Sequence, residues 1–179
     1  MRRELLAHDA RGLAVLEAAC QGWPERPRRD GWGHGIGYAR YKNTGAWCAV
    51  WAEVEVGATL HVRRLRIVAD VGLAVNPDGV SQQLEGGAIQ ATSACLLESA
   101  KPAHAGWADY PILRFADVPA IEVTLVPGAE PSLGAGECSL GPTAAAIGNA
   151  LFDALGVRVR ELPFTPERIV AAIDEGTPT

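Results

Sequence analysis

The sequence predicts an α+β fold, an antiparallel sheet with helices packed on one face. Two neighbouring segments, 47–56 and 64–71, alternate between two sets of side chains with the period of a half-buried strand. The segments 80–98 and 143–155 instead repeat apolar residues at helical spacing. These patterns predict the element order α-β-β-β-α-β-α-α. Residues 1–30 are interpreted as an N-terminal helix and linker, followed by one α+β domain over 31–179.

Composition and charge narrow the class of protein. The 179 residues suffice for one well-buried domain, and 48% hydrophobic with 21% charged residues is ordinary globular composition. A net charge of -5 argues against a nucleic-acid binder. The N-terminus lacks the apolar run of a secretory signal, and no segment approaches a membrane span. Four cysteines without CxxC spacing indicate neither a zinc site nor a redox pair, and are typical of reduced thiols in a cytoplasmic protein.

The N-terminal part reads as a helix, a linker and a first strand. Residues 9–20 carry apolar side chains at helical spacing, with Asp9 as a plausible N-cap. A polar linker is expected over 21–30. The glycines of 31–37 superficially suggest a phosphate-binding loop, but such a loop follows a strand and opens a helix. Here they lead into an expected strand at 38–42. His34 is interpreted as a polar loop residue rather than a ligand, because no second His, Cys or acidic ligand lies at a matching spacing.

The next two strands are expected to form a hairpin. A two-residue turn at 57–58 would place Val50 opposite Leu65, and Cys48 opposite Ile67. Both apolar sets then lie on one face of the sheet, as a consistent register requires.

The segment 80–98 is expected to be a largely enclosed helix. Asn76-Pro77-Asp78-Gly79 is a helix-start signal. One apolar stripe runs along the helix, and Ile89 and Leu96 place further apolar side chains on the opposite side. Gln83, Gly87 and Gln90 follow at i, i+4 and i+7 along the edge of the stripe. Buried amides need hydrogen-bond partners, which either neighbouring backbone or a polar ligand would supply.

A glycine-rich loop around Glu137 is the feature with the clearest chemical potential. A strand is expected over 121–125, then this loop, then a helix with Pro142 at its first position and Gly156 at its end. A last helix is expected to begin near Pro166. A carboxylate on such a loop is either a catalytic base or a charge favoured by the helix dipole.

Several short stretches together resemble one family. They are Ala39-Arg40-Tyr41-Lys42-Asn43, Asn76-Pro77-Asp78-Gly79, Gln83-Leu84-Glu85-Gly86-Gly87-Ala88-Ile89-Gln90, Tyr110-Pro111-Ile112-Leu113 and Gly134-Ala135-Gly136-Glu137. Their order and spacing are similar to the C-terminal end of the large, molybdopterin-binding subunit of the xanthine dehydrogenase/aldehyde oxidase family. The likeness is greatest to the bacterial branch of nicotinate and isoquinoline dehydrogenases, and it covers almost the whole chain.

The resemblance implies a site and its cofactors. Glu137 would be the base that takes a proton from the attacking hydroxyl, while Gln83 and Gly136 would contact the cofactor and no side chain would bind the metal. The implied cofactor is molybdopterin with molybdenum, in its cytosine dinucleotide form. Iron–sulfur clusters would lie on a partner subunit. The implied substrate is a small N-heteroaromatic compound or aldehyde, oxidised with water as the oxygen source.

The chain also departs from the family. Family subunits are several times longer and build the cofactor site largely from upstream segments, so an upstream large-subunit polypeptide is expected as a partner. Met1 lies about where the last segment of the family's subunit would begin. The chain is therefore interpreted as a split subunit, a truncated product or an excised domain. Cys138 places an oxidisable thiol beside the site. The alternative function is a catalytically silent domain or assembly module, and the isolated chain is expected to be inactive in both cases.

Overall fold

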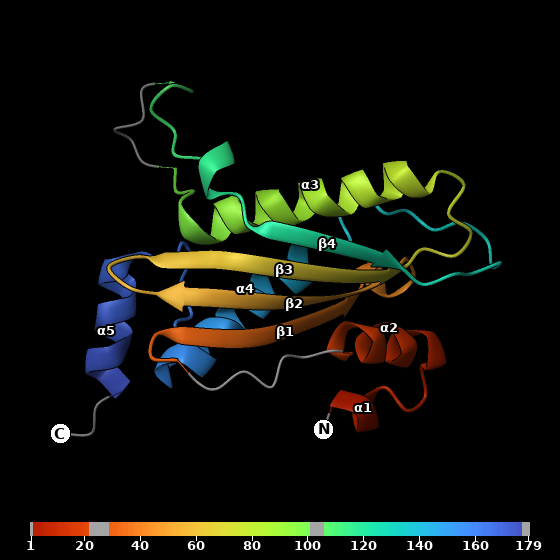
Figure 1. Ribbon diagram of the computed structural model, residues 1–179, viewed down its shortest axis with the longest axis horizontal. Coiled ribbons are helices and arrows are strands. Elements are labelled where there is room, and N and C mark those ends of the chain that lie inside the picture. Colours follow the sequence, from red (N-terminus) through yellow and green to blue (C-terminus); the bar gives the residue numbers. More distant parts are fainter. Residues whose placement is uncertain (1, 22–28, 101–105, 177–179) are drawn as a thin grey trace.

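The computed structural model describes residues 2–21, 29–100 and 106–176, which form a four-stranded sheet with helices on both faces (Figure 1). The α+β class is confirmed. The elements are α1 (Arg2–Leu5), α2 (Ala10–Cys20), β1 (Trp32–Arg40), η1 (Tyr41–Asn43), β2 (Trp47–Val56), β3 (Leu60–Asp70), α3 (Pro77–Leu96), η2 (Phe115–Asp117), β4 (Ala120–Leu125), α4 (Leu140–Leu155) and α5 (Pro166–Gly176). The predicted linker falls largely on residues 22–28, which lie outside the described residues.

The sheet is mixed rather than wholly antiparallel. Its order is β1-β2-β3-β4, and the first three strands pair antiparallel. β4 pairs parallel to β3, with Val123 beside Ile67. A parallel pair needs a crossover of a dozen or more residues. The segment between β3 and β4, which contains α3, is long enough to bring the chain back to the same end of the sheet.

The prediction that helices cover only one face was also wrong, because α2 packs on the other face. Val15, Leu16 and Ala19 of α2 are buried against Trp47 and Ala49 of β2. From the alternation in the sequence alone, the face of β2 that carries Trp47 and Ala49 is the less buried face of a half-buried strand. The structure shows that the first eight residues of β2 are all buried, as expected for a central strand covered on both faces.

The β2–β3 hairpin is confirmed, but its register differs from the prediction by two residues. Val50 pairs with Ile67 and Cys48 with Ala69. The loop has three residues, 57–59, and a bulge near Glu53 adds one more residue on β3. These two single-residue changes add up to a shift of two. Because side chains alternate with a period of two, the same apolar set still faces the core.

β1 begins earlier than predicted, and its glycines let α4 lie directly on the strand. A Cβ at Gly33 would come within 2.1 Å of Ala150 O, one at Gly35 within 2.1 Å of Ala146 O, and one at Gly37 within 2.0 Å of the Pro142 carbonyl oxygen. Every second residue of β1 therefore meets every fourth residue of α4, and only glycine fits there.

His34 consequently lies in a strand and not in a loop. Its Nε2 is 3.1 Å from Glu53 Oε2, and its ring stacks on Trp51 with the centroids 5.4 Å apart.

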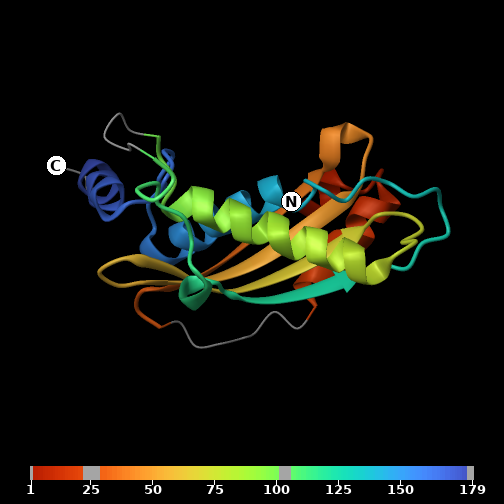
Figure 2. The ribbon, with the colours of Figure 1, turned by 90° about the horizontal axis from the view of Figure 1, so that it is seen from above.

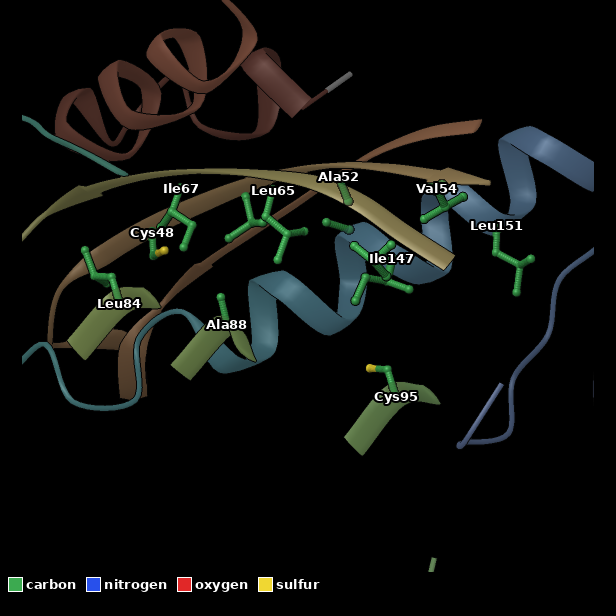
Figure 3. Close-up of a cluster of buried hydrophobic side chains, with 14 of the residues drawn as sticks. Cys48, Ala52, Val54, Leu65, Ile67, Leu84, Ala88, Cys95, Ile147 and Leu151 are labelled. Carbon is green, nitrogen blue, oxygen red and sulfur yellow. The ribbon is translucent and has the colours of Figure 1, made fainter. Parts of the chain in front are cut away.

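The main core lies between the sheet and the layer of α3 and α4 (Figure 3). Leu65 and Ile67 of β3 meet Leu84 of α3 and Ile147 of α4, and all four are fully buried. α3 crosses above the sheet near β4 (Figure 2). Burial of such side chains contributes about 1.5–3 kcal/mol each. This layer fixes α3 and the start of α4 relative to each other.

Polar groups attach α2 to the sheet. Asp9 caps α2 by accepting from Gly12 N at 3.0 Å, and it also accepts from Trp47 Nε1 at 2.7 Å. Arg11 Nε donates to Asp70 Oδ2 at 2.7 Å, and its guanidinium lies over the Trp47 ring. The hydrogen bonds from Arg11, opposed by burial, hold the pKa of Asp70 below its ordinary value.

The helix signals in the sequence are mostly confirmed. Asn76 Oδ1 accepts from Gly79 N at 3.0 Å, and Gly156 ends α4 in the left-handed conformation with φ of 76°. α4 begins at Leu140, so Pro142 is its third residue rather than its first. No helix in the described ranges is both long and apolar enough to cross a membrane.

Candidate functional site

Glu137 lies in the turn that joins the long loop after β4 to α4. Leu140 N donates to the Glu137 carbonyl oxygen at 3.2 Å, which closes the turn just before the helix. The Glu137 side chain is exposed, and its carboxylate accepts a hydrogen bond from the Tyr41 hydroxyl. The carboxylate is therefore oriented by a side chain from a distant part of the sequence, a contact that a charge serving only the helix dipole does not need.

Tyr41 is held by a tight turn at the end of β1. Tyr41 N donates to Ala46 O at 2.9 Å, and Gly45 N donates back to Tyr41 O at 2.7 Å. Lys42 and Asn43 both have positive φ, 50° and 60°. Non-glycine residues in this region cost about 1–2 kcal/mol each, and such strain gathers at functional sites.

A shallow cavity of about 320 Å³ opens at this point. Its lining includes Tyr41 and Lys42 of η1, together with residues of the turn and the start of α4, namely Glu137, Cys138, Leu140 and Pro142. The predicted strand at 38–42 therefore ends at Arg40, and its last two residues belong to the wall of the cavity instead.

Gln83 comes to the same place from α3. A Cβ on Gly136 would lie 4.0 Å from Gln83 Oε1, so the amide stands beside the loop backbone directly before Glu137. Gln83 is exposed, and its amide has no hydrogen bond to any other residue that the structure describes. The three residues singled out in the sequence, Gln83, Gly136 and Glu137, are thus brought together.

Ser139 fixes α3 against this loop. Its hydroxyl donates to the Leu84 carbonyl oxygen at 2.9 Å, and both residues are fully buried. Gly87, one turn further along α3, faces the same hydroxyl, and a Cβ there would lie 2.4 Å from Ser139 Oγ. The conformation of the loop is therefore coupled to the first turns of α3.

The prediction that α3 is enclosed on two faces was wrong. Gln83 and Gln90 are both exposed, and Ile89 and Leu96 are only partly buried. α3 lies at the side of its layer, so a single stripe that includes Leu84 and Ala88 meets the core. Neither amide is a buried group that requires a partner inside this chain.

Cys138 is buried in the core, and it is also one of the residues that line the cavity. It is 2% exposed, and Cys48 of β2 is fully buried beside it. The hydrogen bond to Cys138, together with burial, raises the pKa of the Cys48 thiol. The expected oxidisable thiol is therefore next to Glu137 in sequence but shielded from solvent.

Sequence reasoning does not single out Tyr41 or Ser139 as site residues. The sequence pattern places Tyr41 in a strand, and its neighbours Asn43 and Gly45 are the turn-forming residues that could have ended that strand earlier. Within residues 2–21, 29–100 and 106–176, no three His, Cys, Asp or Glu side chains are grouped as metal ligands.

Comparisons with known proteins identify the family of the chain. A family model described as a molybdopterin cofactor-binding domain matches residues 17–119. A nicotinate dehydrogenase subunit from Pseudomonas putida is 44% identical over 156 residues, 79% of this chain and 13% of that protein. The beta subunit of isoquinoline 1-oxidoreductase from Brevundimonas diminuta is 35% identical, over 90% of this chain and 22% of that protein.

Solved structures show the same fold. Quinoline 2-oxidoreductase from Pseudomonas putida 86 superposes with a TM-score of 0.66 at 31% identity, over 73% of this chain and 19% of that one. The aldehyde oxidoreductase of Desulfovibrio gigas gives a TM-score of 0.66 at 27% identity, over 72% of this chain and 15% of that one.

The fold and the matched residues define a molybdopterin cofactor-binding domain. The chain belongs to the xanthine dehydrogenase/aldehyde oxidase family, as a partial chain of its molybdopterin-binding subunit. It spans between about one eighth and one quarter of the length of the two curated relatives described above.

Proposed function

We propose that this chain forms one wall of the active site of a molybdenum-cofactor hydroxylase, which oxidises an N-heteroaromatic compound or an aldehyde with oxygen from water. The observation that carries the proposal is that Gln83 lies beside Gly136, directly before Glu137, which lines the cavity. The names of the relatives, which include nicotinate, isoquinoline, quinoline and aldehyde oxidoreductases, support the substrate class.

The surface around Gln83 fits a polar cofactor. Gly86 on α3, and Gly134 and Gly141 beside Glu137, have only open space where a Cβ would stand, and none has a positive φ. Packing inside this chain therefore does not require glycine at these three positions. A bare backbone beside an exposed amide suits close approach of a flat, hydrogen-bonding group. The proposed group is molybdopterin in its cytosine dinucleotide form, contacted by Gln83 and Gly136.

The cofactor, when bound, supplies the two-electron oxidation of the substrate. The part of this chain is to hold and move a proton. One Glu137 oxygen accepts from the Tyr41 hydroxyl, which leaves the other free to accept a proton from the oxygen nucleophile. A carboxylate fixed in this way needs less reorganisation when the proton moves.

The exposed position of Glu137 and Gln83 fits a site that another polypeptide completes. Enzymes exclude water around a reacting centre, and in this chain the cavity is open. The proposed partners are the polypeptide carrying the remainder of the cofactor-binding subunit and an iron–sulfur subunit that takes the electrons. We propose a cytoplasmic complex in which this chain alone is inactive.

A complementation experiment tests the role of Glu137. The Pseudomonas putida nicotinate dehydrogenase subunit, with its matching 156-residue segment deleted, would be expressed together with this chain. Nicotinate oxidation and molybdenum content are measured. Glu137→Gln should lower turnover by about 10²–10⁴-fold without loss of molybdenum. Glu130→Gln, an exposed carboxylate on the same loop, is the matched control. An active Glu137→Gln complex would show that the base is a different group.

The role of Gln83 is tested separately. Gln83→Ala should lower the molybdenum and pterin content of the purified complex, while Gln90→Ala, an exposed amide two turns along the same helix, should not. Equal loading in both variants would argue against the cofactor contact. A folded complex that never binds molybdenum, even with the wild-type chain, would favour the silent assembly module.

A further inference from the structure

The two edges of the sheet differ in how they are protected. The backbone of β1 is occupied by side chains of α4. Asp153 Oδ2 accepts from His34 N at 3.0 Å, and Asn149 Nδ2 donates to Ile36 O at 2.9 Å. Arg158 Nη1 donates to Asn149 Oδ1 at 2.7 Å, which holds the same side-chain amide in place. Another strand cannot pair with β1 without displacing these contacts.

The outer edge of β4 has no such protection. Val126 N donates to Ala69 O at 2.8 Å, so alternation along the strand turns the backbone of Glu122 and Thr124 towards β3. The backbone N–H and C=O groups of Ile121, Val123 and Leu125 then point away from the sheet. No side chain or loop in the described ranges is hydrogen-bonded to these groups.

β4 carries one exposed charge, Glu122, but lacks other features that discourage strand pairing. Its sequence, AIEVTL, contains neither proline nor lysine, and its pairing with β3 shows no bulge. It is the outermost strand of the sheet (Figure 1), and none of its six residues is buried. A regular edge strand of this kind can act as a template for another strand.

Exposed apolar side chains lie along the chain that leads into β4. Phe115, in η2 shortly before β4, is fully exposed, and Trp107 is 92% exposed. Ile112 between them is 44% exposed. Several large exposed apolar side chains in one short segment are typical of an interaction surface.

We infer that the outer edge of β4 pairs with a strand of the polypeptide that completes the cofactor-binding subunit. This inference rests on the proposed function, which requires such a polypeptide. The relatives support this occupant, because more than three quarters of each lies outside the segment that this chain matches. Pairing would satisfy the outward groups of Ile121, Val123 and Leu125, and it would bring the partner over Phe115.

The test uses this chain and the Pseudomonas putida nicotinate dehydrogenase subunit from which the matching segment is deleted. Hydrogen exchange is measured on the chain alone and in the purified complex. The amides of Ile121, Val123 and Leu125 should exchange at least about tenfold more slowly in the complex. Val123→Pro removes an outward N–H, which an edge strand tolerates, and should weaken binding about tenfold or more. Val123→Ala keeps the N–H and is the matched control.

The outcomes distinguish failure of this inference from failure of the proposed function. If the complex forms and the three amides exchange as in the free chain, the partner exists and only the pairing is wrong. If the wild-type chain binds nothing, both proposals fail. Protection that rises with the concentration of the chain alone, with a dimer in size-exclusion chromatography, would assign the edge to a second copy and overturn the inference. Because the exchange measurement uses the wild-type chain, it tests the inference even if Val123→Pro does not fold.

Discussion

The Ser139 hydroxyl and the Leu84 carbonyl oxygen are joined by a 2.9 Å hydrogen bond in the core. This bond links α3, which carries Gln83, to the turn that carries Glu137. The two proposed site residues come from segments more than fifty residues apart, and Ser139 is the buried polar contact between them. The geometry of the site is therefore set by a residue that does not line the cavity.

Replacing Ser139 with alanine should destabilise the chain by about 1–2 kcal/mol, because a buried hydrogen bond is lost. Urea unfolding of the isolated chain measures the loss. Ser132→Ala is the control, since this hydroxyl bonds to the Leu73 carbonyl oxygen at an exposed position on the same loop. Its effect should stay below about 0.5 kcal/mol. Equal effects of the two substitutions would mean that the Ser139 bond adds nothing.

Alanine substitutions at two adjacent glycines of α3 should change the stability of the chain in opposite directions. Gly86→Ala points into open space, and should stabilise the isolated chain by about 0.5–1 kcal/mol through helix propensity. Gly87→Ala places a Cβ 2.4 Å from Ser139 Oγ, so the hydroxyl must turn away from Leu84 and stability should fall. Thermal unfolding compares the pair. If both variants are stabilised, the contact between Gly87 and Ser139 is loose.

Gly35→Ala should be the most damaging of the glycine substitutions. Its Cβ would meet backbone atoms of α4, Ala146 O at 2.1 Å and Ala150 N at 2.3 Å, and backbone cannot rotate away. A loss of about 3 kcal/mol or more is expected. Gly57→Ala, in the β2–β3 loop with nothing within 4 Å, serves as the control. Soluble yield and the urea midpoint report the difference, and similar midpoints would contradict the close packing of α4 on β1.

Acid should weaken the attachment of α2. The pKa of Asp70 is held low in the folded chain by Arg11, so its stabilising effect is complete above the unfolded pKa of about 3.9. That effect is lost as the pH falls through the lower folded value. Asp70→Asn should be less stable at pH 7 and show a shallower decline below pH of about 4. Urea unfolding at several pH values tests this, with Asp174→Asn, an exposed carboxyl on α5, as control.

Tyr41→Phe should impair turnover in the completed enzyme without preventing its assembly. Loss of the hydroxyl frees the Glu137 carboxylate, and kcat should fall by roughly tenfold with KM changed by less than about twofold. Tyr110→Phe, which removes a hydroxyl bonded to Glu98, is the control. A rise in KM alone would instead place Tyr41 in substrate binding.

Local patterns predicted much of the fold. The caps Asp9, Asn76 and Gly156 mark helix ends because they act through neighbouring residues. The direction of β4 was missed because it depends on a long crossover and not on its own alternation. The second covered face was missed because Trp47 and Ala49 look the same on an exposed strand as under a helix.

The site was predictable only in part. Gln83, Gly136 and Glu137 were found through the order of short motifs, whereas Tyr41 required knowing where β1 ends. The amides of α3 were expected to be buried because the sequence shows apolar side chains on two sides of the helix. It does not show that only one side has a neighbour.

The direct seating of α4 on Gly33, Gly35 and Gly37 has a consequence for engineering. Side chains can be exchanged to reshape a pocket, but α4 meets β1 without side chains between them, so no substitution in β1 can move the helix closer. The position of Glu137 at the head of α4 is in this sense a property of the backbone. Attempts to change substrate preference should therefore remodel η1 and α3. The position of the Glu137 carboxylate, which the packing of α4 on β1 determines, should be left unchanged.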